Sequence, residues 1–199
     1  MEMKACPLFR LLANNDAMPL YFIAVPAPSP IAEKICSWKT DLGERFGTKA
    51  SLRSPAHITL VPPFYLKEEY LEMLTKKLSH FAGGRKTFQV KIDGFGHFGR
   101  KVIYAAVEKS EELESLRTDL CKAFNEPGLF QLVPDEGPFH PHITLAHRDL
   151  KSMDFDAAWE PFSKEKYRDH FIVKEISLFR NEKEGWNTIG RFPLLVAKC

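Results

Sequence analysis

Several large classes of protein are excluded by what the sequence has little of. Its 199 residues include only four cysteines (Cys6, Cys36, Cys121, Cys199), without Cys-x-x-Cys spacing, so we expect reduced thiols in a cytoplasmic protein and no structural zinc site. No stretch approaches the ~18 consecutive apolar residues of a membrane span. The net charge is only +2. Extended binding to duplex DNA needs many more cationic contacts, so we expect no duplex DNA partner.

The N-terminus lacks the continuous apolar core and the cleavage site of a secretion signal. Residues 1–17 are expected to form an extension, because Asn14-Asn15-Asp16 interrupts them. Residues 18–199 are then expected to form a single domain, since a chain of this length can bury about 70% of its unfolded surface. We expect it to be a monomer.

One tetrapeptide occurs twice. His57-Ile58-Thr59-Leu60 follows Pro55 closely, and His142-Ile143-Thr144-Leu145 follows Pro141. Successive side chains of a strand point to opposite faces, and the β-branched Ile and Thr favour strands. In each copy the His and Thr therefore share one face, while Ile and Leu point into the core.

Two such strands facing each other would provide two imidazoles and two hydroxyls, which suits phosphoryl chemistry. The pKa of imidazole lies nearest neutrality, so one His can accept a proton while the other donates one. The hydroxyls of Thr59 and Thr144 can bind the non-bridging oxygens of a phosphate. We therefore predict His57 and His142 as catalytic residues and the two threonines as substrate-binding residues, with no metal and no cofactor.

At this point the chain resembles the 2H phosphoesterases, a superfamily that includes 2′-5′ RNA ligase-like proteins and cyclic nucleotide phosphodiesterases, and that carries paired His-x-Thr-Leu motifs. The resemblance covers about residues 18–195. It implies an α+β fold with two lobes, each an antiparallel-rich sheet with outer helices, around a central cleft. Many members continue the second motif with Arg, where this chain has His147 followed by Arg148. A hydrolase acting on a 2′,3′-cyclic phosphate or a 2′-5′ linkage is implied, with a nucleotide or an RNA end as its partner.

The rest of the chain predicts strands and helices in a repeated order. Strands are expected at 19–25, 56–61, 88–92, 102–107, 142–146, 171–179 and 186–195, and helices at 30–46, 67–80, 110–125 and 152–165. Pro62-Pro63 are expected to end the first His strand, and Gly94–Gly99 to form a turn. The repetition of strand, helix, His strand and helix indicates an internal duplication.

Other side chains close to the motifs in sequence are candidates for substrate contact. Phe64, Tyr65 and Phe139 could stack on a base, although core packing is the commoner role of such residues. Arg148 could neutralise a phosphate, although most surface arginines are simply solvated. Two alternatives to an enzyme also fit the motifs. The cleft could bind a nucleotide or an RNA end without turnover, or the histidines could serve only as hydrogen-bonding residues at strand ends.

Overall fold

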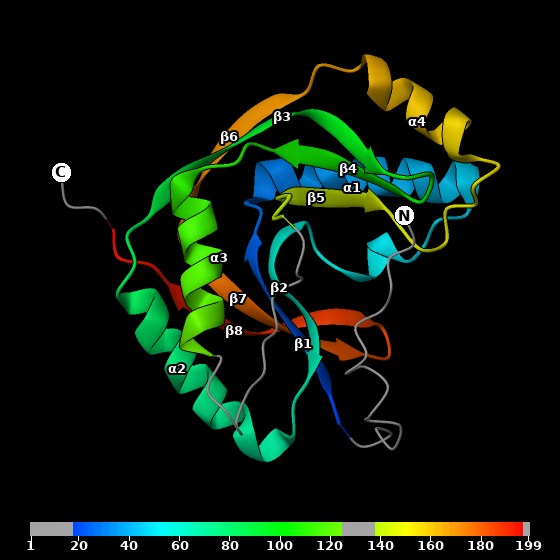
Figure 1. Cartoon of the computed structure of the whole chain (residues 1–199). Helices are drawn as coiled ribbons and strands as arrows, with labels where there is room; N and C mark the ends of the chain where they lie inside the picture. Colours follow the sequence, from blue (N-terminus) through cyan, green and yellow to red (C-terminus); the bar gives the residue numbers. More distant parts are fainter. Residues whose placement is uncertain (1–17, 125–137, 197–199) are drawn as a thin grey trace.

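A computed structural model describes residues 18–124 and 138–196 of the chain, and Figure 1 shows its arrangement. The predicted extension 1–17 lies outside the described residues, so its separation from the domain stays a prediction. The strands are β1 (Leu20–Pro26), β2 (His57–Tyr65), β3 (Phe88–Phe98), β4 (Val102–Val107), β5 (His142–Ala146), β6 (Arg168–Val173), β7 (Glu175–Glu182) and β8 (Gly185–Pro193). The α-helices are α1 (Ser29–Phe46), α2 (Leu71–Gly83), α3 (Glu111–Ala123) and α4 (Phe155–Lys164), and short 3₁₀ turns are η2 (Ser51–Arg53) and η3 (Glu68–Tyr70).

The strands form two antiparallel sheets of four, in the orders β2-β1-β7-β8 and β5-β4-β3-β6. This confirms the α+β fold with two sheets and outer helices. The two sheets are arranged alike. In each, the His strand, β2 or β5, lies at one edge and pairs with the strand that precedes it in the sequence, β1 or β4. The duplication expected from the sequence is therefore visible in the tertiary structure.

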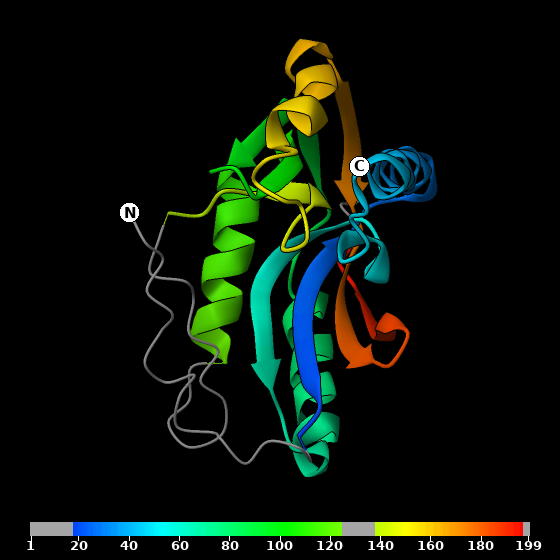
Figure 2. The ribbon, with the colours of Figure 1, turned by 90° about the vertical axis from the view of Figure 1, so that its right-hand side faces the viewer.

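Helices are exchanged between the two halves. Helix α1 connects two strands of the first sheet but packs against β5 of the second, while α3 connects two strands of the second sheet and contacts β2 of the first. In Figures 1 and 2, α2 and α3 lie beside the first sheet, and α1 and α4 beside the second. One hydrophobic cluster includes buried side chains from both sheets and from all of these helices. The two halves therefore share a core.

Local sequence explains most helix boundaries. Helix α1 begins at the Pro28-Ser29-Pro30 segment and ends at Gly47, which adopts φ 72 and donates its N–H to Gly43. Prolines suit the first helical turn because their missing N–H would have no helical partner there. The side chain of Ser110 accepts from the N–H of Leu113 and so caps α3. None of the helices in the described part of the chain combines the length and apolar composition needed to cross a membrane.

Three strand predictions were wrong in their limits. Strand β2 does not stop at Pro62-Pro63 but continues to Tyr65; it is an edge strand, where proline is tolerated, and its pairing with β1 is irregular at this place. The Gly94–Phe98 segment belongs to β3, with Gly94 in a bulge, and the turn comes only at Gly99. The predicted strand 171–179 is two strands, β6 and β7, which belong to different sheets.

Substitution of Gly185 is expected to destabilise the protein, because this residue has φ 148 and an added Cβ would collide with the carbonyl oxygen of Arg53. We expect Gly185→Ala to lower the free energy of unfolding by roughly 1–3 kcal/mol, measured by chemical denaturation. Gly83→Ala is the matched control, since Gly83 ends α2 and an added Cβ there meets nothing within 4 Å. Equal stability of the two variants would contradict this role of Gly185.

Candidate active site

The two His strands meet where the sheets adjoin. β2 and β5 pack against each other, and in both motifs the His and Thr are half-buried while the Ile and Leu are fully buried. The alternation expected from the sequence therefore holds in both copies. His142 lies near enough to His57 for its charge to act on the pKa of that residue.

Both imidazoles are held in the same way. Nδ1 of His57 lies 2.7 Å from the carbonyl oxygen of Pro55, and Nδ1 of His142 lies 2.7 Å from that of His140. A carbonyl oxygen can only accept, so each Nδ1 carries the proton and the neutral ring keeps its lone pair on Nε2. Each motif therefore presents a ring nitrogen that can take up and give back a proton.

The pKa values of both imidazoles are below the usual range. Burial lowers the pKa of His57 to about 4, opposed by the hydrogen bond to Pro55 and assisted by the charges of Lys39, His142 and His147. Burial also lowers the pKa of His142, opposed by its bond to the His140 carbonyl. Without a bound anion, both rings are therefore neutral at pH 7. A phosphate between them would favour the charged forms and raise both pKa values.

The threonine hydroxyls have no hydrogen-bond partner in the described part of the chain. Within the described residues, neither Thr59 Oγ1 nor Thr144 Oγ1 takes part in a hydrogen bond, and both side chains are half-buried rather than enclosed. A half-buried hydroxyl beside an imidazole can donate to a phosphate oxygen. The four residues of the paired motif could therefore supply two proton carriers and two hydrogen-bond donors.

The other candidates from the sequence have different surroundings. Phe64 and Tyr65 lie at the far end of β2, about 23 and 26 Å along the strand from His57 at roughly 3.3 Å per residue, and Phe64 packs against the shared core. Phe139 also packs against the core, with the guanidinium of Arg117 over its ring. Arg148 is exposed and has a left-handed φ of 64. The structure thus places Phe64 and Tyr65 far along the strand from His57, and Phe139 against the core.

Other aromatic side chains, from β1, β3 and β4, lie beside the imidazoles. The ring of Phe22 lies 4.7 Å from that of His57, and those of Tyr104 and Phe98 lie 5.0 and 5.1 Å from that of His142. Trp186 in turn contacts Phe22, with ring centroids 4.6 Å apart. Sequence reasoning missed these residues, because they come close to the motifs only through strand pairing.

Two further residues lie near the site: Lys39, which was not expected, and His147, which stands where many family members have Arg. Lys39 is buried in α1, and His147 is half-buried with a pKa lowered by burial, by Arg148 and by Lys39. The sequence did contain a signal for Lys39, since it lies four residues after Ile35 and three before Leu42, on the buried face of its helix. A lysine at such a position is unusual and marks a residue with special partners.

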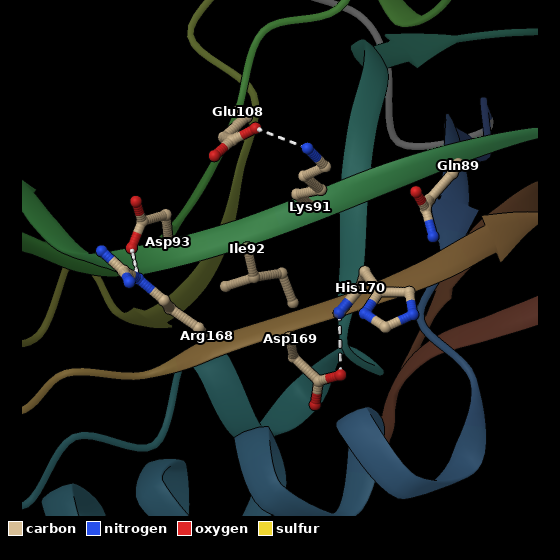
Figure 3. A pocket seen from close by; sticks show the side chains of 8 residues that line it. All are labelled: Gln89, Lys91, Ile92, Asp93, Glu108, Arg168, Asp169 and His170. Carbon is tan, nitrogen blue, oxygen red and sulfur yellow. Dashed lines mark hydrogen bonds and ion pairs between the residues drawn. The ribbon is translucent and has the colours of Figure 1, made fainter.

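A pocket of about 630 Å³ lies on β3 and β6 (Figure 3), the two strands of that sheet farthest from β5. Its cationic side chains are already paired, Lys91 with Glu108 at 4.0 Å and Arg168 with Asp93 at 2.9 Å. Little free positive charge is left for a phosphate there. In the described part of the chain, no group of three or more His, Cys, Asp or Glu residues is placed to hold a metal ion.

Comparison with known proteins identifies the family to which the chain belongs. The model of the 2′-5′ RNA ligase superfamily matches residues 27–185. A Bacillus subtilis protein named RNA 2′,3′-cyclic phosphodiesterase is 30% identical over 188 residues, covering 90% of this chain and 98% of its own. A Bacillus cytotoxicus protein that carries the name of a phosphoesterase is 33% identical over 142 residues, covering 70% and 79%.

The fold agrees with solved structures. Escherichia coli LigT complexed with 3′-AMP superimposes with a TM-score of 0.65 at 23% identity, covering 89% of this chain and 98% of that one. The structure of the Thermus thermophilus protein TT0787 gives the same TM-score at 24% identity, with the same coverage.

The fold and the paired motifs thus define a phosphoesterase of the two-histidine class, as the resemblance implied. The chain belongs to the 2′-5′ RNA ligase superfamily. It is an enzyme, a hydrolase of phosphate esters. The prediction of an enzyme, rather than of a module that only binds, is therefore confirmed.

Proposed function

We propose that this protein hydrolyses the 2′,3′-cyclic phosphate at RNA or nucleotide ends, with 2′-5′ phosphodiesters as the second substrate of the same site. One observation carries the proposal: two matching His-x-Thr strands, at corresponding edges of two sheets, hold their imidazoles in the same tautomer. The cyclic phosphate is favoured because the Bacillus subtilis relative bears that name. Nucleotide binding is supported by LigT, which has been solved with 3′-AMP, ATP and NADP⁺.

The two imidazoles have complementary roles in this reaction. Nε2 of one neutral His takes a proton from water as the water oxygen bonds to phosphorus. The other, protonated His gives its proton to the ribose oxygen as the bond from that oxygen to phosphorus breaks. The product is a phosphomonoester, and the pair ends with its protonation exchanged, so one proton must pass through solvent before the next turnover.

The two threonines and the lowered pKa of His57 suggest the remaining roles. Thr59 and Thr144 donate to the non-bridging oxygens, where negative charge grows in the transition state. Burial, assisted by the charge of Lys39, lowers the pKa of His57 to about 4, so this ring is neutral at pH 7 and its Nε2 is free to accept a proton. We infer that His57 is the base and His142 the acid.

Turnover of a 2′,3′-cyclic nucleotide in EDTA tests the function. We expect hydrolysis to continue and kcat/KM to follow a bell-shaped pH profile that is highest below pH 6.5. Activity of the free enzyme should fall as the pH rises further, because the acid then loses its proton at a pKa that burial has lowered. The profile of kcat should lie at higher pH, since the bound phosphate raises both pKa values. No product at long times, or activity lost in EDTA, would contradict the proposal.

A further inference from the structure

We propose that Lys39 and Asp149 are positioning residues that clamp residues 47–56, here called the His57 loop, from two sides and so fix the orientation of His57. The catalytic consequence rests on the proposed function. The structural part, the orientation of His57, does not.

Lys39 holds the carbonyl side of the loop. Its side chain is only 3% exposed, and Nζ donates to the carbonyl oxygens of Ser51 and Ser54, both at 3.0 Å. Burial lowers the pKa of this ammonium to about 8, which still leaves it mostly charged at pH 7. Hydrogen bonds from a charged donor are stronger than neutral ones, and loss of the donor would leave the Ser51 carbonyl buried without this partner.

Asp149 holds the amide side of the same loop. Its Oδ2 accepts from the N–H groups of Lys49 at 2.6 Å and Ala50 at 2.8 Å. Asp149 lies just after β5, so the segment that follows the second His strand binds the loop that leads into the first, β2. The left-handed φ of Arg148, 64, turns the chain at this point. A non-glycine residue in this conformation is uncommon, and here it delivers the carboxylate to the loop.

Lys39 acts on His57 through successive backbone carbonyls, while Asp149 holds the earlier part of the loop, at Lys49 and Ala50. The carbonyl of Ser54 is bound by Lys39, and the next carbonyl, that of Pro55, accepts from Nδ1 of His57 at 2.7 Å. The following carbonyl, that of Ala56, accepts from the N–H of Ala27. Three consecutive carbonyls thus have fixed partners, and the middle one sets the plane and tautomer of the imidazole.

The polar groups around the loop show why strong anchors are needed. Four buried atoms have no hydrogen-bond partner within the described residues: Thr48 Oγ1, Ser51 Oγ, His147 Nδ1 and Asp149 Oδ1. Buried polar atoms without partners cost free energy. The buried residues of the loop are Thr48, Ser51 and Ala56, and the hydrogen bonds made by Lys39 and Asp149 offset part of this cost.

The charge of Lys39 also gives His57 and His142 different electrostatic surroundings. It acts on the pKa of His57 and of His147, whereas the groups that act on the pKa of His142 are its burial and His140. His142 therefore serves as an internal reference in any measurement of a Lys39 variant.

Four variants test the clamp in the full-length protein: Lys39→Met, Lys39→Arg, Asp149→Ala and Asp149→Asn. We expect kcat on a 2′,3′-cyclic nucleotide to fall about 10- to 100-fold in Lys39→Met and Asp149→Ala, the effect of misplacing a reacting group by about 1 Å, with little change in KM. Asp149→Asn keeps an acceptor oxygen and should recover part of the loss. By NMR, the pKa of His57 should rise in Lys39→Met while that of His142 stays unchanged.

Matched controls are Lys34→Met, an exposed lysine on the same helix, and Asp154→Ala, whose carboxylate makes no hydrogen bond or ion pair within the described residues. Thermal unfolding identifies any variant that fails to fold; Lys39→Arg and Asp149→Asn then replace it. If wild-type protein is active and the variants keep both kcat and the pKa of His57, the clamp is wrong and the function stands. If wild type has no activity, the function is wrong. The NMR signal of the Nδ1–H of His57 still decides the clamp, because in Lys39→Met and Asp149→Ala it should shift or broaden when the bond to the Pro55 carbonyl is loosened.

Discussion

Alanine at His57 or at His142 is expected to lower kcat for a 2′,3′-cyclic nucleotide by about 10²- to 10⁴-fold, the usual contribution of a general acid or base. The reason is that each ring carries one of the two protons moved in a turnover. The double variant should be little slower than the slower single variant, because acid and base act on one step and their losses do not add. Steady-state kinetics with the purified variants measures both effects.

The controls for this experiment are histidines outside the site. His80→Ala on α2 and His170→Ala on β6 replace exposed side chains, so their kcat should match wild type. Turnover that survives in either His57→Ala or His142→Ala would remove that residue from the mechanism. A full loss in the His80 variant would show that the assay reports folding rather than chemistry.

Loss of the threonine hydroxyls is expected to have the next largest effect. Thr59→Val or Thr144→Val should lower kcat by roughly 10²- to 10³-fold, as for removal of one donor to a developing negative charge. Valine has nearly the shape of threonine and suits a strand, so stability should change little. In the double variant, binding of a nucleoside 3′-phosphate, measured by calorimetry, should also be lost.

Serine at the same positions is the matched control, since Thr59→Ser and Thr144→Ser keep the hydroxyl and lose only a methyl group. These variants should keep most of the activity. Equal kinetics for the valine and serine variants would contradict a role for the hydroxyls as phosphate donors and would leave backbone N–H groups as the better candidates.

Much of the fold could be predicted because its signals are local. The helical spacing of Leu113, Leu116 and Leu120 predicted α3, and the alternation in both His-x-Thr motifs predicted which face each side chain occupies. Errors came where pairing overrides local preference. Pro62-Pro63 are accommodated within β2 because that strand is an edge, and a sequence alone does not say which strands are edges.

The candidate site was predictable only in its centre. His57, His142, Thr59 and Thr144 share a repeated pattern, whereas the aromatic candidates were chosen because they are close in sequence. Phe64 and Tyr65 lie far along the same strand, and the rings beside the imidazoles, Phe22 and Tyr104, come from neighbouring strands. Distance along the chain is a poor guide to distance across a sheet.

The sequence by itself determined the paired motif, its orientation on each strand and the class of chemistry, because side-chain alternation and the pKa of imidazole are local properties. Only the tertiary structure decided that β7 and β8 return to the first sheet, that the helices are exchanged, and that Lys39 and Asp149 meet at the His57 loop. These are contacts between residues far apart in the chain. They depend on which surfaces of the whole molecule can be buried together, and no short stretch of sequence specifies that.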